Sequence, residues 1–146
     1  MKPGRRSLVL DWLIAGAVAS ALSGIPSTIY SAVTGADIAE PTRAAGAMLV
    51  RANSSDLRLF TAAAVVHIAV SFFWSGILIL ILPRTFITSA CVLAALLIGV
   101  LDLRIIAPHF FPEVARLPFL PQMADHLMWG ACLGLMLRRR WQQHAG

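Results

Sequence analysis

Charged residues are scarce in this chain. Of its 146 residues only 13% are Asp, Glu, Lys or Arg, whereas 58% are hydrophobic. Ordinary soluble domains carry about 25% charged residues, and a water-soluble fold of this length could not hide so much apolar surface. The composition therefore indicates a membrane protein, because lipid itself solvates apolar side chains. The length allows a single domain.

Cysteine and catalytic motifs are scarce as well. The only two cysteines, Cys91 and Cys132, lie in apolar runs without a CxxC or metal-ligand spacing, which argues against a disulfide scaffold. The sequence contains no G-x-S-x-G, no H-E-x-x-H and no glycine-rich phosphate loop. We therefore expect a protein that is not an enzyme. The one enzymatic alternative is a membrane hydrolase whose catalytic dyad is assembled across helices.

What the sequence does contain is long apolar segments. Crossing a bilayer takes about 20 mostly apolar residues, and segments of this kind run approximately over residues 8–33, 57–82, 85–107 and 120–137. Only Pro83 and Arg84 separate the second segment from the third, which predicts a tight antiparallel hairpin. The expected fold is an all-α, antiparallel bundle of four transmembrane helices.

Prolines mark the expected interruptions. Pro26 lies inside the first segment and predicts a kink, because it removes a backbone hydrogen bond. Glu40 followed by Pro41 favours a short surface helix through about Val50 in the first outer loop. Residues 108–121 contain four prolines and predict a stiff, irregular connection rather than a helix.

Basic residues indicate the orientation, since cytoplasmic loops retain an excess of Lys and Arg. With the N-terminus inside, the inner side holds Lys2, Arg5, Arg6, Arg84, Arg138, Arg139 and Arg140, against Arg43, Arg51, Arg58, Arg104 and Arg116 outside. We expect both termini in the cytoplasm and the lipid bilayer, including anionic lipid, as the partner of the basic clusters. No basic stripe is interleaved with aromatics, so we expect no nucleic-acid binding.

Small residues recur at helical spacing on three segments. In lipid, helices approach closely where such residues face each other. We therefore expect helix interfaces at these stripes, either within the chain or between copies in a homo-oligomer. The stripes are Gly16, Ser20, Ser23, Ser27 and Ser31 in the first segment; Thr88, Cys91, Ala95, Gly99 and Asp102 in the third; and Gly130 and Gly134, with His126 one turn earlier, in the fourth.

Several ionisable side chains fall within the apolar segments, where a charge costs roughly 2.5 to 3.5 kcal/mol at a helix centre. His67 lies deep in the second segment, and Ser71 and Trp74 continue its face. Because Asp102 and Arg104 are two residues apart, we expect Asp102 to face the bundle and Arg104 to snorkel outward. Asp11, near the inner end, is expected at the interface or paired with Arg5 or Arg6. The expected outward-facing polar pocket is lined by His67, Asp102, Asp125 and His126, with Ser71, Trp74 and Arg104 beside it.

Several interpretations of this cluster are open. It binds a small ligand or ion, or belongs to an accessory subunit of a larger membrane complex. Alternatively it is a proton- or cation-coupled transport unit, in which His67 and Asp102 exchange protons and Arg104 biases them. His67 and His126 could also ligate metal or haem, but no spacing is specific for either, so we assign no cofactor. The plainest alternative is a structural network among His67, Asp102 and His126.

Several short motifs carry a resemblance to known proteins. They are GIPST at residues 24–28, TGAD at 34–37, TRAAG at 42–46 and PQMADH at 121–126, together with His67, Trp74, Leu82-Pro83 and Leu101-Asp102. The set resembles a group of short, uncharacterised bacterial integral membrane proteins, and the likeness covers most of the chain. The resemblance implies a four-helix protein of the bacterial plasma (inner) membrane and brings no established activity with it.

Overall fold

The computed structural model describes residues 5–143, with side chains from residue 8, and the described part is all-helical without a strand. The all-α prediction is confirmed. Five helices form the body of the molecule: α1 (Arg5–Leu22), α2 (Ile25–Thr34), α4 (Asp56–Ile81), α5 (Ile87–Leu101) and α8 (Phe119–Gln143). Shorter pieces connect them: α3 (Glu40–Gly46), a π-helix (Asp102–Ile106), α6 (Ala107–Phe110) and α7 (Pro112–Ala115).

Among the described residues, three helical stretches are long and apolar enough to cross a membrane. They are Leu8–Thr34, Asp56–Ile81 and Ile87–Phe110. The fourth predicted segment lies within α8, which is equally long but more polar and is not one of the three. The structure therefore supports a membrane protein with three candidate spans, and a fourth crossing stays a prediction.

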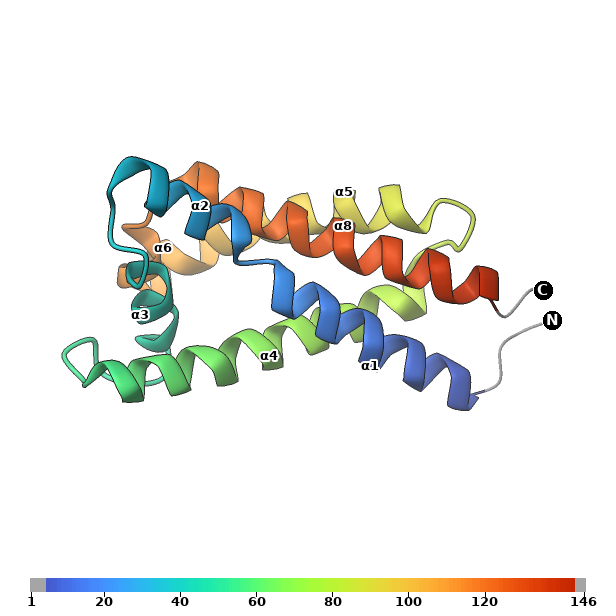
Figure 1. Cartoon of the computed structure of the whole chain (residues 1–146), viewed down its shortest axis with the longest axis horizontal. Coiled ribbons are helices and arrows are strands. Elements are labelled where there is room, and N and C mark those ends of the chain that lie inside the picture. The colour runs from blue at the N-terminus through green and yellow to red at the C-terminus, as the bar shows by residue number, and fades with distance from the viewer. Residues whose placement is uncertain (1–4, 144–146) are drawn as a thin grey trace.

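The helices are not arranged as the hairpin prediction requires. α8 packs along α5, α1 and α2, whereas α4 packs on α1 and α3 (Figure 1). Within the described residues α4 joins the main apolar core only near its C-terminal end, where Leu78 and Ile79 are buried. From their short connection α4 and α5 diverge, so the expected tight antiparallel hairpin is wrong. Leu82 is extended, as residues before proline tend to be, and this directs the chain away from α4.

The partner of α5 is α8, and small residues explain why. A Cβ atom added at Gly130 would lie 2.5 Å from the Ala95 Cβ and 2.7 Å from the Cys91 carbonyl oxygen. One added at Gly134 would lie 2.6 Å from the Thr88 Cα. The small-residue stripes of the third and fourth segments therefore face each other, which confirms a close interface within the chain.

The first predicted helix is broken rather than merely kinked. α1 ends at Leu22 and α2 begins at Ile25, so that Pro26 occupies the first turn of a new helix, where its missing N–H is not needed. The start of α1, the end of α8 and the α4–α5 connection lie at one end of the molecule, and α2, α3 and α6 lie toward the other (Figure 1).

The proline-rich connection is more helical than expected. Residues 107–110 and 112–115 form α6 and α7, so the prediction of an irregular connection is wrong there. Pro108 and Pro112 each fall in the first turn of their helix, where proline is tolerated. The π-helix before them closes with a bond from the Ala107 N–H to the Asp102 carbonyl, five residues back. α3 ends at Gly46, short of the expected Val50, and α8 runs on to Gln143.

Candidate functional site

The break between α1 and α2 exposes backbone polar groups that side chains from two other helices satisfy. His67 of α4 places its Nε2 atom 2.8 Å from the Ser20 carbonyl oxygen and 3.1 Å from the Ser23 hydroxyl. A carbonyl oxygen can only accept, so the Nε2 atom carries the hydrogen and donates it. At the other side of the break, the Ser27 N–H, one of the unpaired donors at the start of α2, donates to the Asp125 Oδ1 atom at 2.9 Å.

A second pair of polar side chains lies where the π-helix meets α8. The His126 Nδ1 atom is 2.9 Å from the Gln122 carbonyl oxygen, and its Nε2 atom is 3.4 Å from the Asp102 Oδ2 atom. Both ring nitrogens thus face oxygen acceptors, an arrangement that a doubly protonated imidazolium satisfies. π-helical turns occur frequently at functional sites, and this one begins at Asp102.

Asp125 connects the two pairs. It is the chain neighbour of His126, and its carboxylate interacts electrostatically with both His67 and His126. Asp125 is half-buried, whereas His67 is exposed on the outside of the bundle. We call His67, Asp102, Asp125 and His126 together the break cluster. It contains two imidazoles and two carboxylates, which come from α4, from the π-helix after α5 and from α8.

The remaining predicted site residues are placed differently. Arg104 is exposed, and its guanidinium lies 4.1 Å from the centre of the Phe119 ring at the start of α8. Asp102 contacts His126 of the same helix, and the expected snorkelling of Arg104 stays a prediction. Trp74 packs against the main core. Ser71 is buried on α4, and no contact places it in the cluster. A closed network of His67, Asp102 and His126 does not form, because His67 bonds to α1 instead.

Other ionisable groups of the chain make separate contacts. The His109 Nδ1 atom is 2.7 Å from the Ile105 carbonyl oxygen, and Glu113 pairs with Arg116. At the opposite end, buried Asp11 pairs with Arg140 rather than with a neighbour in sequence. The side chains of Arg5 and Arg6, its expected partners, lie outside the described residues.

Sequence reasoning missed the contacts that hold α1 against α4. The Trp12 indole N–H lies 3.1 Å from the Phe72 carbonyl oxygen and 3.0 Å from the Ser75 hydroxyl oxygen. The serines of the first segment appeared only as a packing stripe, yet Ser20, Ser23 and Ser27 supply the atoms that His67 and Asp125 bind. The sequence feature that could have indicated these contacts is Pro26, which lies within the serine stripe and marks where backbone groups lose their helical hydrogen bonds.

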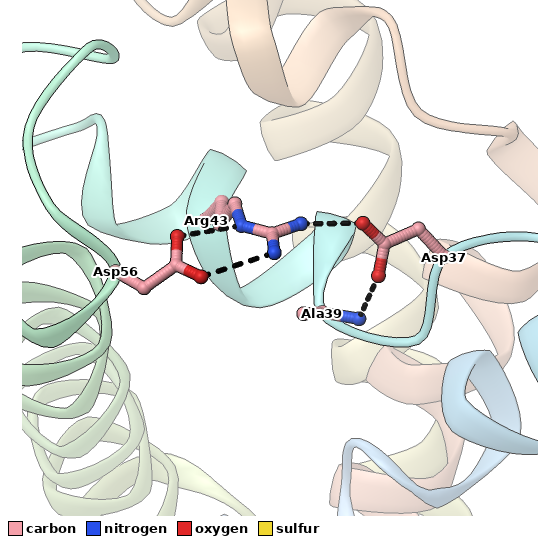
Figure 2. Close-up of polar contacts among 4 residues, drawn as sticks. All are labelled: Asp37, Ala39, Arg43 and Asp56. Atoms are coloured by element: carbon pink, nitrogen blue, oxygen red, sulfur yellow. Dashed lines mark hydrogen bonds and ion pairs between the residues drawn. The ribbon is translucent and has the colours of Figure 1, made fainter.

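Asp37, Arg43 and Asp56 form a network of ion pairs, here called the clasp, at the end of the molecule where α3 lies (Figure 1). Arg43 of α3 binds both oxygens of Asp56 at 2.9 and 3.2 Å, and its other amino group binds Asp37 (Figure 2). Asp37 in turn accepts from the Ala39 N–H at 2.8 Å. The Ala39 N–H and the Arg43 guanidinium hold the pKa of Asp37 below its ordinary value, and the two carboxylates raise the pKa of Arg43. The clasp ties α3 to the start of α4.

The space beside the break is small. A cavity of about 20 Å³ adjoins Ser27 and Ser31 and is bounded by the loop before α8. That volume holds about one water molecule. Within the described residues no three His, Cys, Asp or Glu side chains are placed to hold a metal ion. None of the four break-cluster side chains lines the small cavity.

Comparison with known proteins gives no relative from which a role could be transferred. No protein-family model, no curated protein and no solved structure matches this chain.

Proposed function

We propose that this chain is a four-pass protein of a bacterial plasma membrane whose break cluster handles a proton or small cation, without catalysing a reaction. In this proposal α8 is the fourth crossing, both termini are cytoplasmic, and α3 is a surface helix in the first outer loop. Arg138, Arg139 and Arg140 at the end of α8 support that orientation. The same cluster would serve an accessory subunit equally well, if the chain works beside a larger transporter.

One observation carries the proposal: the first candidate span is discontinuous, and titratable side chains occupy both sides of its break. Discontinuous membrane helices are a recurring device for ion and substrate sites, because the break frees backbone carbonyls for cations and N–H groups for anions. Here the Ser20 carbonyl meets His67 and the Ser27 N–H meets Asp125. Protonation of Asp125 removes the negative charge that accepts the Ser27 N–H, whereas protonation of His67 strengthens its N–H bond to the Ser20 carbonyl and adds a second N–H donor.

The chemistry follows from these contacts. A proton bound at one of these groups changes the electrostatic field at the next, because Asp125 interacts with the charges of His67 and His126, and His126 pairs with Asp102. Intramembrane carboxylates and histidines mark proton and ion pathways for this reason. The Ser20 carbonyl and the Asp125 carboxylate, on the two sides of the break, are the oxygen atoms that would attract a small cation.

The proposal is tested in liposomes that contain the purified protein and an internal pH indicator. An imposed pH gradient should dissipate faster than in empty liposomes, and His67→Gln and Asp125→Asn should each reduce the difference at least tenfold. The matched controls are His109→Gln and Glu113→Gln, which change the same residue types outside the cluster and should leave the flux unchanged. Wild-type flux in His67→Gln and Asp125→Asn, or none in the wild type, would refute proton handling.

A further inference from the structure

A second cavity lies at the opposite end of the molecule from the break cluster (Figure 1). It has a volume of about 510 Å³ and lies between the α4–α5 connection, the first turn of α5 and the last turns of α8. Cavities of about 300 to 1,000 Å³ are typical of small-molecule sites. Its polar lining consists of Arg84, Thr85, Thr88, Ser89, Arg138 and Gln142, with the Trp141 ring beside them.

The cavity carries positive charge that no carboxylate among the described residues neutralises. Neither Arg84 nor Arg138 pairs with a carboxylate among residues 8–143, whereas neighbouring Arg140 is paired with Asp11. The Arg84 guanidinium lies 4.9 Å from the centre of the Trp141 ring, a contact that positions the charge without neutralising it. Two guanidinium groups on one cavity therefore remain available to an anion.

The neutral groups around the cavity add hydrogen-bond donors. The Thr88 hydroxyl and the Trp141 indole N–H are both buried without a partner among the described groups. α5 begins here at Ile87, and no side chain caps the free N–H groups of its first turn. Arginines, a hydroxyl, an indole and a helix N-terminus are all groups that bind phosphate oxygens.

We propose that this cavity binds a phosphate group. A phospholipid headgroup and a soluble phosphate compound share this chemistry, and the two sources are separated by experiment. The surroundings suit a lipid, because Phe86, which lines the cavity, and Leu80 and Ile81 at the end of α4 are exposed apolar side chains that offer a surface for acyl chains. Basic sites between helices on the cytoplasmic side are a known way of binding anionic headgroups.

The test compares a cavity variant with a charge-matched control. Arg84→Gln/Arg138→Gln removes both cavity charges, whereas Arg51→Gln/Arg139→Gln removes two exposed arginines that do not line the cavity. Each protein is purified in neutral detergent and titrated with phosphatidylglycerol, phosphatidylcholine or inorganic phosphate. Bound lipid is counted by native mass spectrometry, and phosphate binding is followed by the shift in thermal unfolding.

For a lipid ligand, one phosphatidylglycerol should bind tightly to the wild type and to the control, and phosphatidylcholine should not replace it. The cavity variant should bind roughly 25-fold more weakly, since each basic residue near an anionic group contributes about a fivefold factor. Stabilisation by inorganic phosphate, lost in the same variant, would instead identify a soluble phosphate compound as the source. Arg84→Lys/Arg138→Lys should restore part of the binding, which shows that a loss does not come from misfolding. Equal binding of every probe by the cavity variant and the control would overturn the proposal.

Discussion

Gly130→Ala should separate α5 from α8 and expose Cys91. The new Cβ would lie 2.5 Å from the Ala95 Cβ, whereas ordinary van der Waals contact begins at 3.4 Å. The helices must therefore move apart by about 1 Å at this point. Overpacking of this kind costs about 2 kcal/mol, and the better helix propensity of alanine offsets about 1 kcal/mol of it. We expect a net loss of about 1 kcal/mol in the free energy of unfolding.

Cys91 reports this change directly, because it is buried at the contact itself. In a Cys132→Ser background it is the only thiol, and its rate of reaction with a maleimide dye in detergent measures how often the two helices part. The matched control is Gly76→Ala in the interior of α4, where the new Cβ would lie 3.3 Å from the Trp12 Nε1 atom. Alanine gives both variants the same gain in helix propensity. The difference between their reaction rates therefore isolates the overpacking cost of about 2 kcal/mol, which corresponds to a roughly 30-fold faster reaction for Gly130→Ala. Equal rates in the two variants would refute the packing argument.

Three further predictions concern the other end of the molecule. Gly46→Ala should detach α3 from α4, because the new Cβ would lie 2.1 Å from the Leu59 carbonyl oxygen, a backbone atom that cannot move aside. Hydrogen exchange in residues 40–46 should therefore rise. The control is Gly24→Ala, whose new Cβ has no atom within 4 Å and should leave that exchange unchanged. Asp125→Ala should destabilise the protein by about 1 kcal/mol, the usual cost of losing the acceptor at a helix start, and should speed exchange of the Ser27 amide. The third concerns pH: the folded-state pKa of Asp37 is below the ordinary value of 3.8, so the clasp contributes stability above that value and loses it as the pH falls through the lower folded-state pKa. Exchange in α3, corrected for its intrinsic pH dependence, should therefore rise below about pH 4 in the wild type. The step should be smaller in Asp37→Asn, where Asp56 is the clasp carboxylate that still titrates.

The positions of the long helices follow from the apolar runs, because a run of that length has few other ways to satisfy its backbone in lipid. The choice of partners does not follow from those runs. Adjacency in sequence suggested that α4 and α5 pack together, but the glycines of α8 allow α5 a closer approach than α4 does. The stripes themselves were visible in the sequence. Their pairing was not, because any two small faces are compatible until the connections fix the geometry.

The residues of the break cluster could be predicted from the sequence, but their hydrogen-bond partners could not. Residues at similar depth can be identified by counting along each segment, yet the direction of a side chain depends on the rotation of its helix. Two irregularities change that rotation here. The break at residues 23–24 turns the first helix, and the π-helix from Asp102 inserts an extra residue into its turn. Both irregularities lie next to prolines, so the sequence marked their places without giving their geometry.

The break itself limits how the cluster can be tested. An unsatisfied backbone group is costly in lipid, so the interruption at residues 23–24 persists because His67 and Asp125 bond to its free carbonyl and N–H. The same two side chains are therefore structural in any interpretation, and alanine at either position would confuse loss of fold with loss of chemistry. Glutamine at 67 keeps an N–H donor for the Ser20 carbonyl, and asparagine at 125 keeps an acceptor for the Ser27 N–H. Neither can titrate near neutral pH, so a structural cluster predicts that both variants behave like the wild type. A proton-handling cluster predicts that they fold with near-normal stability and lose flux.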